Sequence, residues 1–258
     1  ILKRPGAYAP HRRRKGDGAQ VRAVLERLIG DLDDTLWDVR PALEAAEAAQ
    51  WSYLNARFPS LALGATPPEE IADLRRTLLE DKPELMHHIS LFRQSFIERL
   101  LQHHCVPGGE AESAASEAFA AFLSQRHKVV LYANAQSVLN TLGRQFQLGA
   151  LTNGNADVRK TQIGSCFDYA WRAEEFGVSK PNPALFHQAF ERAGVSADEV
   201  IHVGDCHDND VSGAVSAGAK AIWFSPDGGA SEIASGVVQE LSELPAAIER
   251  LTGQMGLG

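Results

Sequence analysis

Between residues 40 and 125, apolar residues recur with the spacing of an α-helix. In the first part of this region Leu43, Ala46, Gln50 and Leu54 fall on one side of a segment rich in Ala, Leu and Glu, so that the stripe is largely apolar. A Pro-Gly-Gly break precedes the last helical stretch. The pattern predicts a bundle of four helices without strands, formed by RPALEAAEAAQWSYLNARF, PPEEIADLRRTLLED, LMHHISLFRQSFIERLLQHH and GEAESAASEAFAAFLSQR.

Beyond residue 128, short apolar runs alternate with helical segments. The runs LGALTN, FDYAWRA, EVIHVGD and AKAIWF predict strands, and QSVLNTLGRQF, NPALFHQAFERAG and DVSGAVSAG predict helices between them. The second of these helices has clear ends, because Asn182 can cap it, Pro183 suits its first turn and Gly194 can end it. Alternating strands and helices indicate parallel βαβ units, which favours the α/β class with a Rossmann-like open parallel sheet.

Together the two patterns predict an α/β core interrupted early by a helical insert. We expect residues 21–39 and 126–258 to form the core and residues 40–125 to form a helical-bundle cap domain. Residues 1–20 lack periodicity and contain Pro, Gly and basic residues, which predicts a disordered basic leader.

The first strand has two candidate positions. The run VRAVL at residues 21–25 has the texture of a buried strand, and RLIG at residues 27–30 directly precedes a cluster of acidic residues that begins at Asp31. If residues 21–25 formed the strand, Asp31 would lie about 16 Å of extended chain beyond its end. We favour residues 27–30, although Arg27 then enters the strand and Gly30 leaves a packing deficit.

Composition narrows the classes of partner and compartment. The chain has 258 residues and a formal net charge of −8, but residues 1–15 carry six basic side chains and no acidic one. The remainder is strongly acidic, which makes nucleic acid an unsuitable partner. No apolar run has the roughly 18–20 residues needed to span a membrane, and the three Cys residues are too few and too scattered for a disulfide framework. We therefore expect a cytoplasmic protein that is not bound to a membrane, either a monomer or a homodimer.

Polar side chains follow the predicted strands, where ligands bind in open α/β sheets. Several carboxylates in one crevice require a cation, and a set of oxygen ligands without His or Cys suits Mg²⁺. A Thr hydroxyl, a Lys and the main-chain N–H groups of the TNGN turn can hold a phosphoryl group. These residues predict metal-assisted phosphoryl transfer at a site formed by Asp31, Asp33, Thr152, Asn153, Gly154, Lys180, Asp205 and Asp210.

Four of these segments occur in the order and spacing of a known family. The stretches DLDDT (31–35), LTNGN (151–155), SKPNP (179–183) and VGDCHDND (203–210) resemble the four motifs of the haloacid dehalogenase superfamily of phosphohydrolases. The resemblance covers nearly all of residues 28–225. It implies an enzyme that is a phosphoric monoester hydrolase, with Mg²⁺ as its cofactor and a small phosphorylated metabolite as its substrate.

The resemblance also implies a role for each matched residue. Asp31 corresponds to the nucleophile that forms an aspartyl-phosphate, and Asp33 to the general acid and base, whose main-chain carbonyl is also a metal ligand in the family. The catalytic residues implied in this way are Asp31, Asp33, Thr152 and Lys180. The residues implied to bind the substrate are Thr152, Asn153, Gly154 and Lys180. The implied metal ligands are Asp31, Asp33, Asp205 and, in support, Asp210.

Two alternatives remain beside a phosphatase. In the dehalogenases of the family the second Asp of the first motif is absent, so Asp33 disfavours a 2-haloacid dehalogenase-type hydrolase. A catalytically weak binding or regulatory relative has its only support in the unusual Gly30 before the nucleophile.

The insert resembles the family's helical cap, which closes over the site and contacts the leaving group. More narrowly, LTNGNADVRK, SKPNPALFHQA and HVGD resemble bacterial phosphatases of flavin mononucleotide (FMN) and of the phosphorylated pyrimidine in riboflavin biosynthesis.

Overall fold

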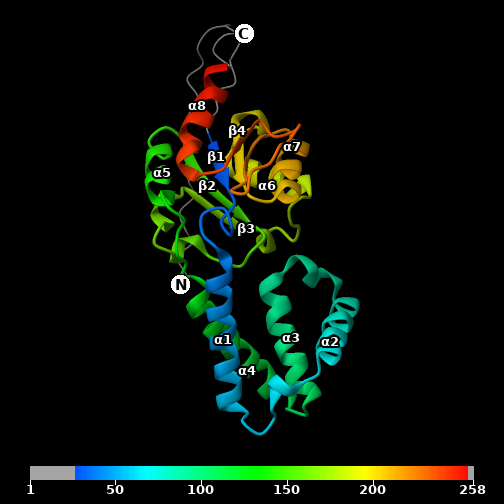
Figure 1. The fold of residues 1–258 in the computed structure, drawn as a ribbon. Helices are drawn as coiled ribbons and strands as arrows, with labels where there is room; N and C mark the ends of the chain where they lie inside the picture. The colour runs from blue at the N-terminus through cyan, green and yellow to red at the C-terminus, as the bar shows by residue number, and fades with distance from the viewer. Residues whose placement is uncertain (1–26, 255–258) are drawn as a thin grey trace, which may run out of the picture.

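A twisted parallel sheet forms one end of the molecule, and a group of helices forms the other (Figure 1). The computed structural model describes residues 27–254. The predicted leader at 1–20 and the candidate strand at 21–25 lie outside the described residues. The strands follow the order β3-β2-β1-β4-β5-β6. Their bounds are Arg27–Gly30 for β1, Gln147–Thr152 for β2, Tyr169–Arg172 for β3, Val200–Gly204 for β4, Lys220–Phe224 for β5 and Gly236–Val238 for β6.

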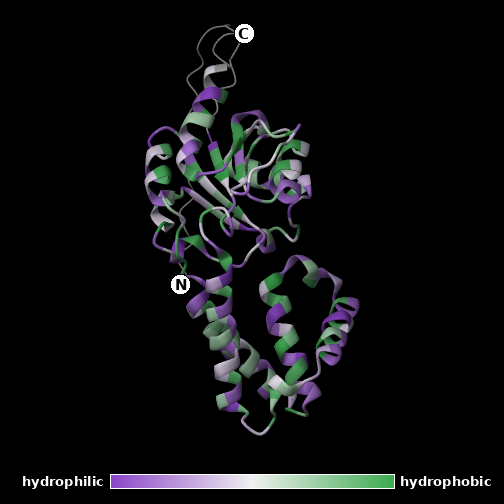
Figure 2. Cartoon of the chain, viewed as in Figure 1, coloured by the Kyte–Doolittle hydropathy of each residue, from purple (hydrophilic) through white to green (hydrophobic). Residues whose placement is uncertain are grey.

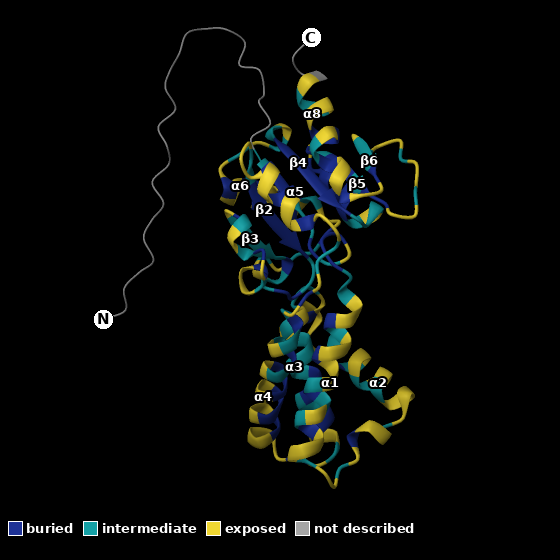
Figure 3. Cartoon of the chain, turned by 60° about the vertical axis from the view of Figure 1, so that its left-hand side comes forward, coloured by how far each residue is buried: buried dark blue, intermediate teal, exposed yellow. Residues whose placement is uncertain are grey.

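Helices cover both faces of the sheet. Alternate residues of each strand point to opposite sides, and apolar side chains on both sides are buried by helices. Leu28 packs with α5 (Ala135–Leu142) and α8 (Leu244–Gln254) on one face. Ile29 packs with α6 (Pro183–Ala193) and α7 (Gly213–Ser216) on the other. The strands carry mainly hydrophobic residues and are mostly buried (Figures 2 and 3). The predicted Rossmann-like α/β class is confirmed, and β1 occupies the favoured position at residues 27–30.

The described residues between the first two strands contain four long helices and no strand. They are α1 (Val39–Arg57), α2 (Pro68–Asp81), α3 (Ile89–His103) and α4 (Gly108–Arg126). A short 3₁₀-helix, Pro83–His87, connects α2 to α3. Helix α1 packs along α4, and α3 packs on α4 and α2. These helices have an apolar core of their own, so we refer to residues 39–126 as the helical segment.

The chain passes twice between the sheet and the helical segment, and the two passages are joined to each other. The main-chain N–H of Tyr132 donates to the carbonyl of Leu36 at 2.9 Å, and Trp37 forms an antiparallel bridge with Leu131. The Trp37 side chain is completely buried at this junction. The segment that leads into α1 and the segment that follows α4 are therefore tied together.

Two parts of the second half differ from the sequence pattern. The stretch predicted as one helix after residue 209 is a π-helical turn, His207–Ser212, followed by the short α7. The turn buries Asp210, a placement that apolar periodicity does not reveal. The pattern also missed β6 and α8. Within residues 27–254, no helix combines the length and the apolar character required to cross a membrane.

Candidate active site

Three strands of the sheet end together at the site. Gly30 of β1 lies in register with Ala150 of β2 and with Val203 of β4, so the residues that follow these positions meet at one edge. The main-chain N–H of Asp31 donates to the carbonyl of Val203 at 2.9 Å, which extends the ladder by one residue. The strand order reverses between β1 and β4, the point where ligands bind in doubly wound sheets.

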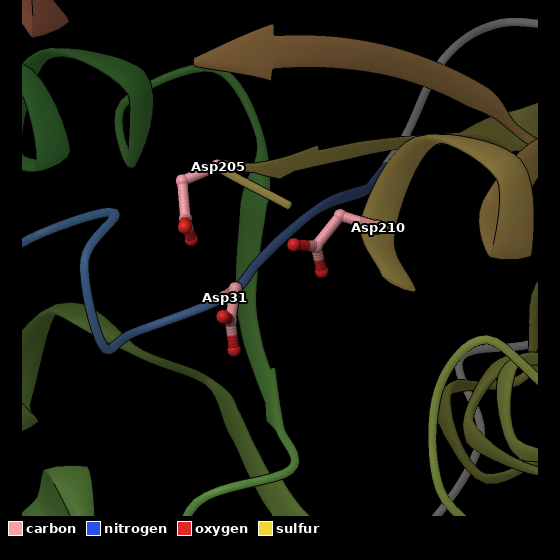
Figure 4. A group of neighbouring side chains, drawn as sticks. All are labelled: Asp31, Asp205 and Asp210. Carbon is pink, nitrogen blue, oxygen red and sulfur yellow. The ribbon is translucent and has the colours of Figure 1, made fainter. Parts of the chain in front are cut away.

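Three carboxylates converge at this edge. Asp31, Asp205 and Asp210 each offer an oxygen atom, and these atoms lie within 4.8 Å of one another (Figure 4). A group of oxygen ligands with no nitrogen or sulfur suits a hard divalent cation such as Mg²⁺. The residues present therefore fit the metal that the sequence predicts.

Asp33 is not in this group, because its carboxylate turns towards the helical segment. Its Oδ1 accepts a hydrogen bond from Nε1 of Trp37 at 2.8 Å, and its Oδ2 accepts one from the guanidinium of Arg126. The prediction that Asp33 is a metal ligand thus concerns its main-chain carbonyl, as in the family pattern.

Lys180 links two of the carboxylates. Its Nζ lies 2.9 Å from Oδ1 of Asp31 and 2.6 Å from Oδ1 of Asp210. The side chain of Asn153 fixes the loop that carries Lys180, since it accepts a hydrogen bond from the Lys180 N–H and donates one to the Lys180 carbonyl. The loop at the end of β2 thereby positions a buried cation against the carboxylate that follows β1.

The pKa values of Asp31 and Asp210, the two acids that Lys180 contacts, are shifted in opposite directions. Burial, reinforced by the charge of Asp210, outweighs the attraction of Lys180 and raises the pKa of Asp31 to about 7. Burial also acts against ionisation of Asp210, but Lys180 and His202 overcome it and hold the pKa of Asp210 well below its usual range. Burial alone would lower the pKa of Lys180, yet Asp210 and Asp31 together raise it. Burial raises the pKa of Asp205 as well. A cation bound among these acids would offset the cost of ionising Asp31 and Asp205.

Asp210 has a further partner that sequence reasoning missed. Nε2 of His202, a fully buried residue of β4, lies 2.9 Å from Oδ1 of Asp210. The N–H of Cys206 donates to the other carboxylate oxygen at 3.1 Å. Burial lowers the pKa of His202, which favours the neutral ring. The signal was present in the sequence as a lone polar residue within the apolar run VIHVG.

Asp205 is positioned by the first motif. The Thr35 hydroxyl donates to Oδ1 of Asp205 at 2.9 Å and accepts the Asp205 N–H at 3.1 Å. Thr35 is buried, so the loop after β1 and the loop after β4 are held together by this side chain. Thr35 is therefore a third residue of the first motif, besides Asp31 and Asp33, that contributes to the site.

The remaining predicted residues, Thr152, Asn153 and Gly154, lie at the end of β2 and in the loop that follows it. The buried Thr152 hydroxyl accepts the N–H of Gly154 at 3.0 Å, which tightens the TNGN turn. Two further acids in and just after the first motif serve the local chain, since Asp34 accepts the N–H of Val39 and Asp38 caps α1.

A cleft of about 340 Å³ lies between the helical segment and the strand-end loops. Asn153, Ala173 and Ser179 line its sheet side. Nδ1 of His87 lies 2.6 Å from the Ser179 hydroxyl, which joins the two walls. The wall from the helical segment is mainly apolar and consists of Leu79, Leu85, Met86, His87, Ile89 and Phe92.

Comparison with known proteins gives the class to which this fold and site belong. Residues 27–218 match the family described as haloacid dehalogenase-like hydrolase. The chain belongs to this family, as its four motifs predicted, and is a hydrolase.

Among curated proteins, the chain is 31% identical to the 5-amino-6-(5-phospho-D-ribitylamino)uracil phosphatase YigB of Escherichia coli (strain K12), over 80% of this chain and 85% of that protein. It is 33% identical to the phosphoserine phosphatase of Thermus thermophilus, over 50% of this chain and 54% of that protein. Both named relatives are phosphatases, in agreement with the predicted enzyme class.

Among solved structures, the chain is similar to a protein described as a 2-haloacid dehalogenase from Pseudomonas syringae pv. Tomato DC3000. The TM-score is 0.83 at 38% identity, and the match covers 88% of this chain and 99% of that one. The similar proteins are thus named either as phosphatases or as a 2-haloacid dehalogenase. Both reactions were considered in the sequence analysis.

Proposed function

We propose that the chain is a Mg²⁺-dependent phosphatase that hydrolyses a small phosphorylated metabolite through an aspartyl-phosphate on Asp31. The observation that carries the proposal is the placement of Asp31 at the switch point of the sheet, 2.9 Å from Nζ of Lys180, with Asp33 two residues further along. A buried cation beside a carboxylate suits a nucleophile that must approach a phosphate dianion.

In the first step, a carboxylate oxygen of Asp31 attacks phosphorus and the bond from phosphorus to the leaving oxygen breaks. Asp33 gives its proton to that oxygen. In the second step, Asp33 takes a proton from water, the water oxygen attacks phosphorus, and the aspartyl-phosphate bond breaks to release inorganic phosphate and regenerate Asp31. Lys180, the Thr152 hydroxyl and the N–H groups of the turn at Asn153 and Gly154 bind the phosphoryl oxygens throughout.

Mg²⁺ would be held by Asp31, Asp205 and the main-chain carbonyl of Asp33, with Asp210 in support, and would neutralise charge on the phosphoryl oxygens. Asp210 is better suited to support the site than to bind the metal directly, because Lys180 and His202 already contact its Oδ1.

The cleft supports a substrate with an organic leaving group of moderate size. Its volume of about 340 Å³ lies within the range of small-molecule sites, and its apolar wall suits the face of a flat ring. YigB, as named, acts on a ribitylamino-uracil phosphate. We therefore propose the phosphorylated pyrimidine of riboflavin biosynthesis or FMN as the substrate, with the helical segment acting as the cap.

A second candidate is a 2-haloacid dehalogenase, favoured by the description of the similar Pseudomonas structure. Asp33 argues against it, since halide is a leaving group that needs no proton. The two reactions release different products and are therefore easy to separate.

The test is a panel of substrates assayed with and without Mg²⁺. We expect Mg²⁺-dependent phosphate release from FMN and the ribitylamino-uracil phosphate, no halide release from 2-haloacids, and no turnover by Asp31→Asn. Halide release without phosphate release would establish the second candidate. Absence of both products from the folded protein would favour a catalytically weak relative, and activity of Asp31→Asn close to that of the wild type would refute the nucleophile.

A further inference from the structure

We propose that Arg126 is a positioning residue that holds the Asp33 carboxylate in place for proton transfer, with Trp37 completing the arrangement. The inference rests on the proposed function, because it concerns the residue proposed as general acid and base. Neither Arg126 nor Trp37 belongs to the four family motifs that the sequence presents.

The two side chains leave the Asp33 carboxylate little freedom. Arg126 donates to Oδ2 through Nη2, and Trp37 donates to Oδ1 through Nε1 at 2.8 Å. Both donors are almost completely buried, so neither can follow Asp33 into other rotamers. A carboxylate held at both oxygens by rigid donors keeps a defined orientation.

Arg126 is in turn fixed by the loop that binds the phosphate in the proposed function. Its Nε donates to Oδ1 of Asn155 at 3.1 Å, and Asn155 is itself buried. Because Arg126 is the last residue of α4, one side chain connects the helical segment, the first motif and the loop after β2. Burying a guanidinium is costly unless it is paired, and the contacts with Asp33 and Asn155 provide this pairing, so loss of Arg126 would leave the Asp33 carboxylate without its charged partner.

Gly154 lies close to the side chains of Asp33, Arg126 and Thr152. A Cβ at Gly154 would overlap Oδ2 of Asp33 and would lie 3.2 Å from Nη2 of Arg126 and 3.3 Å from the Thr152 hydroxyl. Asp33 and Arg126 thus adjoin the proposed phosphate-binding turn. Nη1 of Arg126 has no hydrogen-bond partner within residues 27–254, which makes direct binding of phosphate the competing role. Positioning is favoured because Nε and Nη2 already bind protein acceptors.

The two roles differ in how they depend on the leaving group. An alkoxide must be protonated as it departs, whereas p-nitrophenolate is stable without a proton. If Arg126 positions Asp33, its loss slows hydrolysis of alkyl phosphates much more than that of p-nitrophenyl phosphate. If it binds phosphate, its loss raises KM for both to a similar extent.

The experiment compares kcat and KM for glycerol phosphate and p-nitrophenyl phosphate in Arg126→Met, Arg126→Lys and Trp37→Phe, with Asp33→Asn as reference. We expect Arg126→Met to lose about 10- to 100-fold more kcat on the alkyl ester than on the aryl ester, within the usual contribution of acid–base catalysis. Arg126→Lys should recover part of the loss. The double variant Asp33→Asn/Arg126→Met should be no slower than Asp33→Asn alone.

The matched control is Arg93→Met. Arg93 is a second arginine of the helical segment, less buried than Arg126. It pairs with Glu47, lies 4.0 Å from the ring centre of Phe122 and does not hydrogen-bond to Asp33. Its loss should lower thermal stability but leave the ratio of kcat for the alkyl ester to kcat for the aryl ester unchanged.

Equal losses on both esters, or none, would overturn the positioning role, and equal rises in KM would assign Arg126 to phosphate binding. If Arg126→Met does not fold, Arg126→Lys and Trp37→Phe decide by the same ratio. A wild-type protein inactive on every ester would instead refute the proposed function, which distinguishes the two failures.

Discussion

Gly204 lies directly against the side chain of Asp210, and a Cβ at Gly204 would overlap the Asp210 carboxylate. Gly204 is the last residue of β4, and Asp210 holds Nζ of Lys180 at 2.6 Å. The absence of a side chain at one position therefore allows the buried ion pair at the other. Gly204→Ala should displace Asp210 and with it Lys180, and should lower kcat for phosphate release by about 100-fold, the order expected for misplacing a catalytic group by 1 Å.

Gly30→Ala provides the matched control, since Gly30 is the last residue of the neighbouring strand β1. The nearest atom to a Cβ there would be the carbonyl oxygen of Val203 at 3.7 Å, and Gly30 borders a small apolar cavity of about 30 Å³. We expect this variant to remain active and to gain about 0.5–1 kcal/mol in the free energy of unfolding, because alanine restricts the unfolded chain. Urea denaturation of both variants checks this, and a large loss of stability in Gly30→Ala would contradict the open space at that position.

The raised pKa of Asp31 predicts a pH-dependent stability of the metal-free protein. Its pKa rises from the usual 3.8 to about 7 on folding, so between these pH values the folded protein holds a proton that the unfolded chain has released. The free energy of unfolding therefore falls as pH rises through this window. Asp31→Asn removes the effect, so its Tm should exceed that of the wild type increasingly from pH 4.5 to 7.5, by about 2–4 °C for each kcal/mol.

Added Mg²⁺ should reverse this difference at pH 7.5. A cation bound by ionised Asp31 stabilises the wild type, and the gain should be smaller in Asp31→Asn. Thermal melts with and without the metal measure both effects. A difference in Tm that stays constant with pH would contradict the raised pKa of Asp31.

Thr35 should affect metal affinity through Asp205. Thr35→Val removes a hydroxyl that both donates to the Asp205 carboxylate and accepts its N–H, while keeping the shape of the side chain. Loss of a residue that orients a metal ligand typically weakens binding by about 10- to 100-fold. Calorimetric titration with Mg²⁺ measures this. Thr161→Val is the control, because within residues 27–254 the Thr161 hydroxyl has one hydrogen bond, which it donates to the carbonyl of Val158.

The apolar wall of the cleft should contribute to KM for ring-containing substrates. Ile89 lines the cleft and is 42% exposed, so covering it with a flat ring would bury further apolar surface. Ile89→Ser should raise KM for FMN by about 5-fold, which corresponds to about 1 kcal/mol of lost burial, and should leave KM for glycerol phosphate unchanged. Ile233→Ser is matched in residue type and exposure, at 45%, and does not line the cleft. Equal effects of the two variants would argue against the cleft as the leaving-group site.

The α/β class and the identity of the acidic residues in the site could be predicted from local sequence. Strands buried on both faces require short apolar runs, and parallel strands bring their carboxyl ends to one edge, so polar residues after each run must meet there. Asp31, Asp205 and Asp210 were expected together for this reason, and their oxygen atoms do lie within 4.8 Å of one another. The position of β1 followed from distance along the chain alone.

Only the tertiary structure decided which partners these residues have. Arg126 lies 93 positions from Asp33 and carries no periodic signal, and His202 resembles an interruption of its strand until Asp210 is placed beside it. Periodicity records which face of an element is buried, whereas contacts between side chains from distant elements depend on how those elements pack. The sequence by itself therefore determined the fold class and the charged groups of the site. Packing shifted the pKa values of Asp31, Asp205 and Asp210. It also determined that Arg126, at the end of the helical segment, contacts Asp33, the acid proposed to protonate the leaving group.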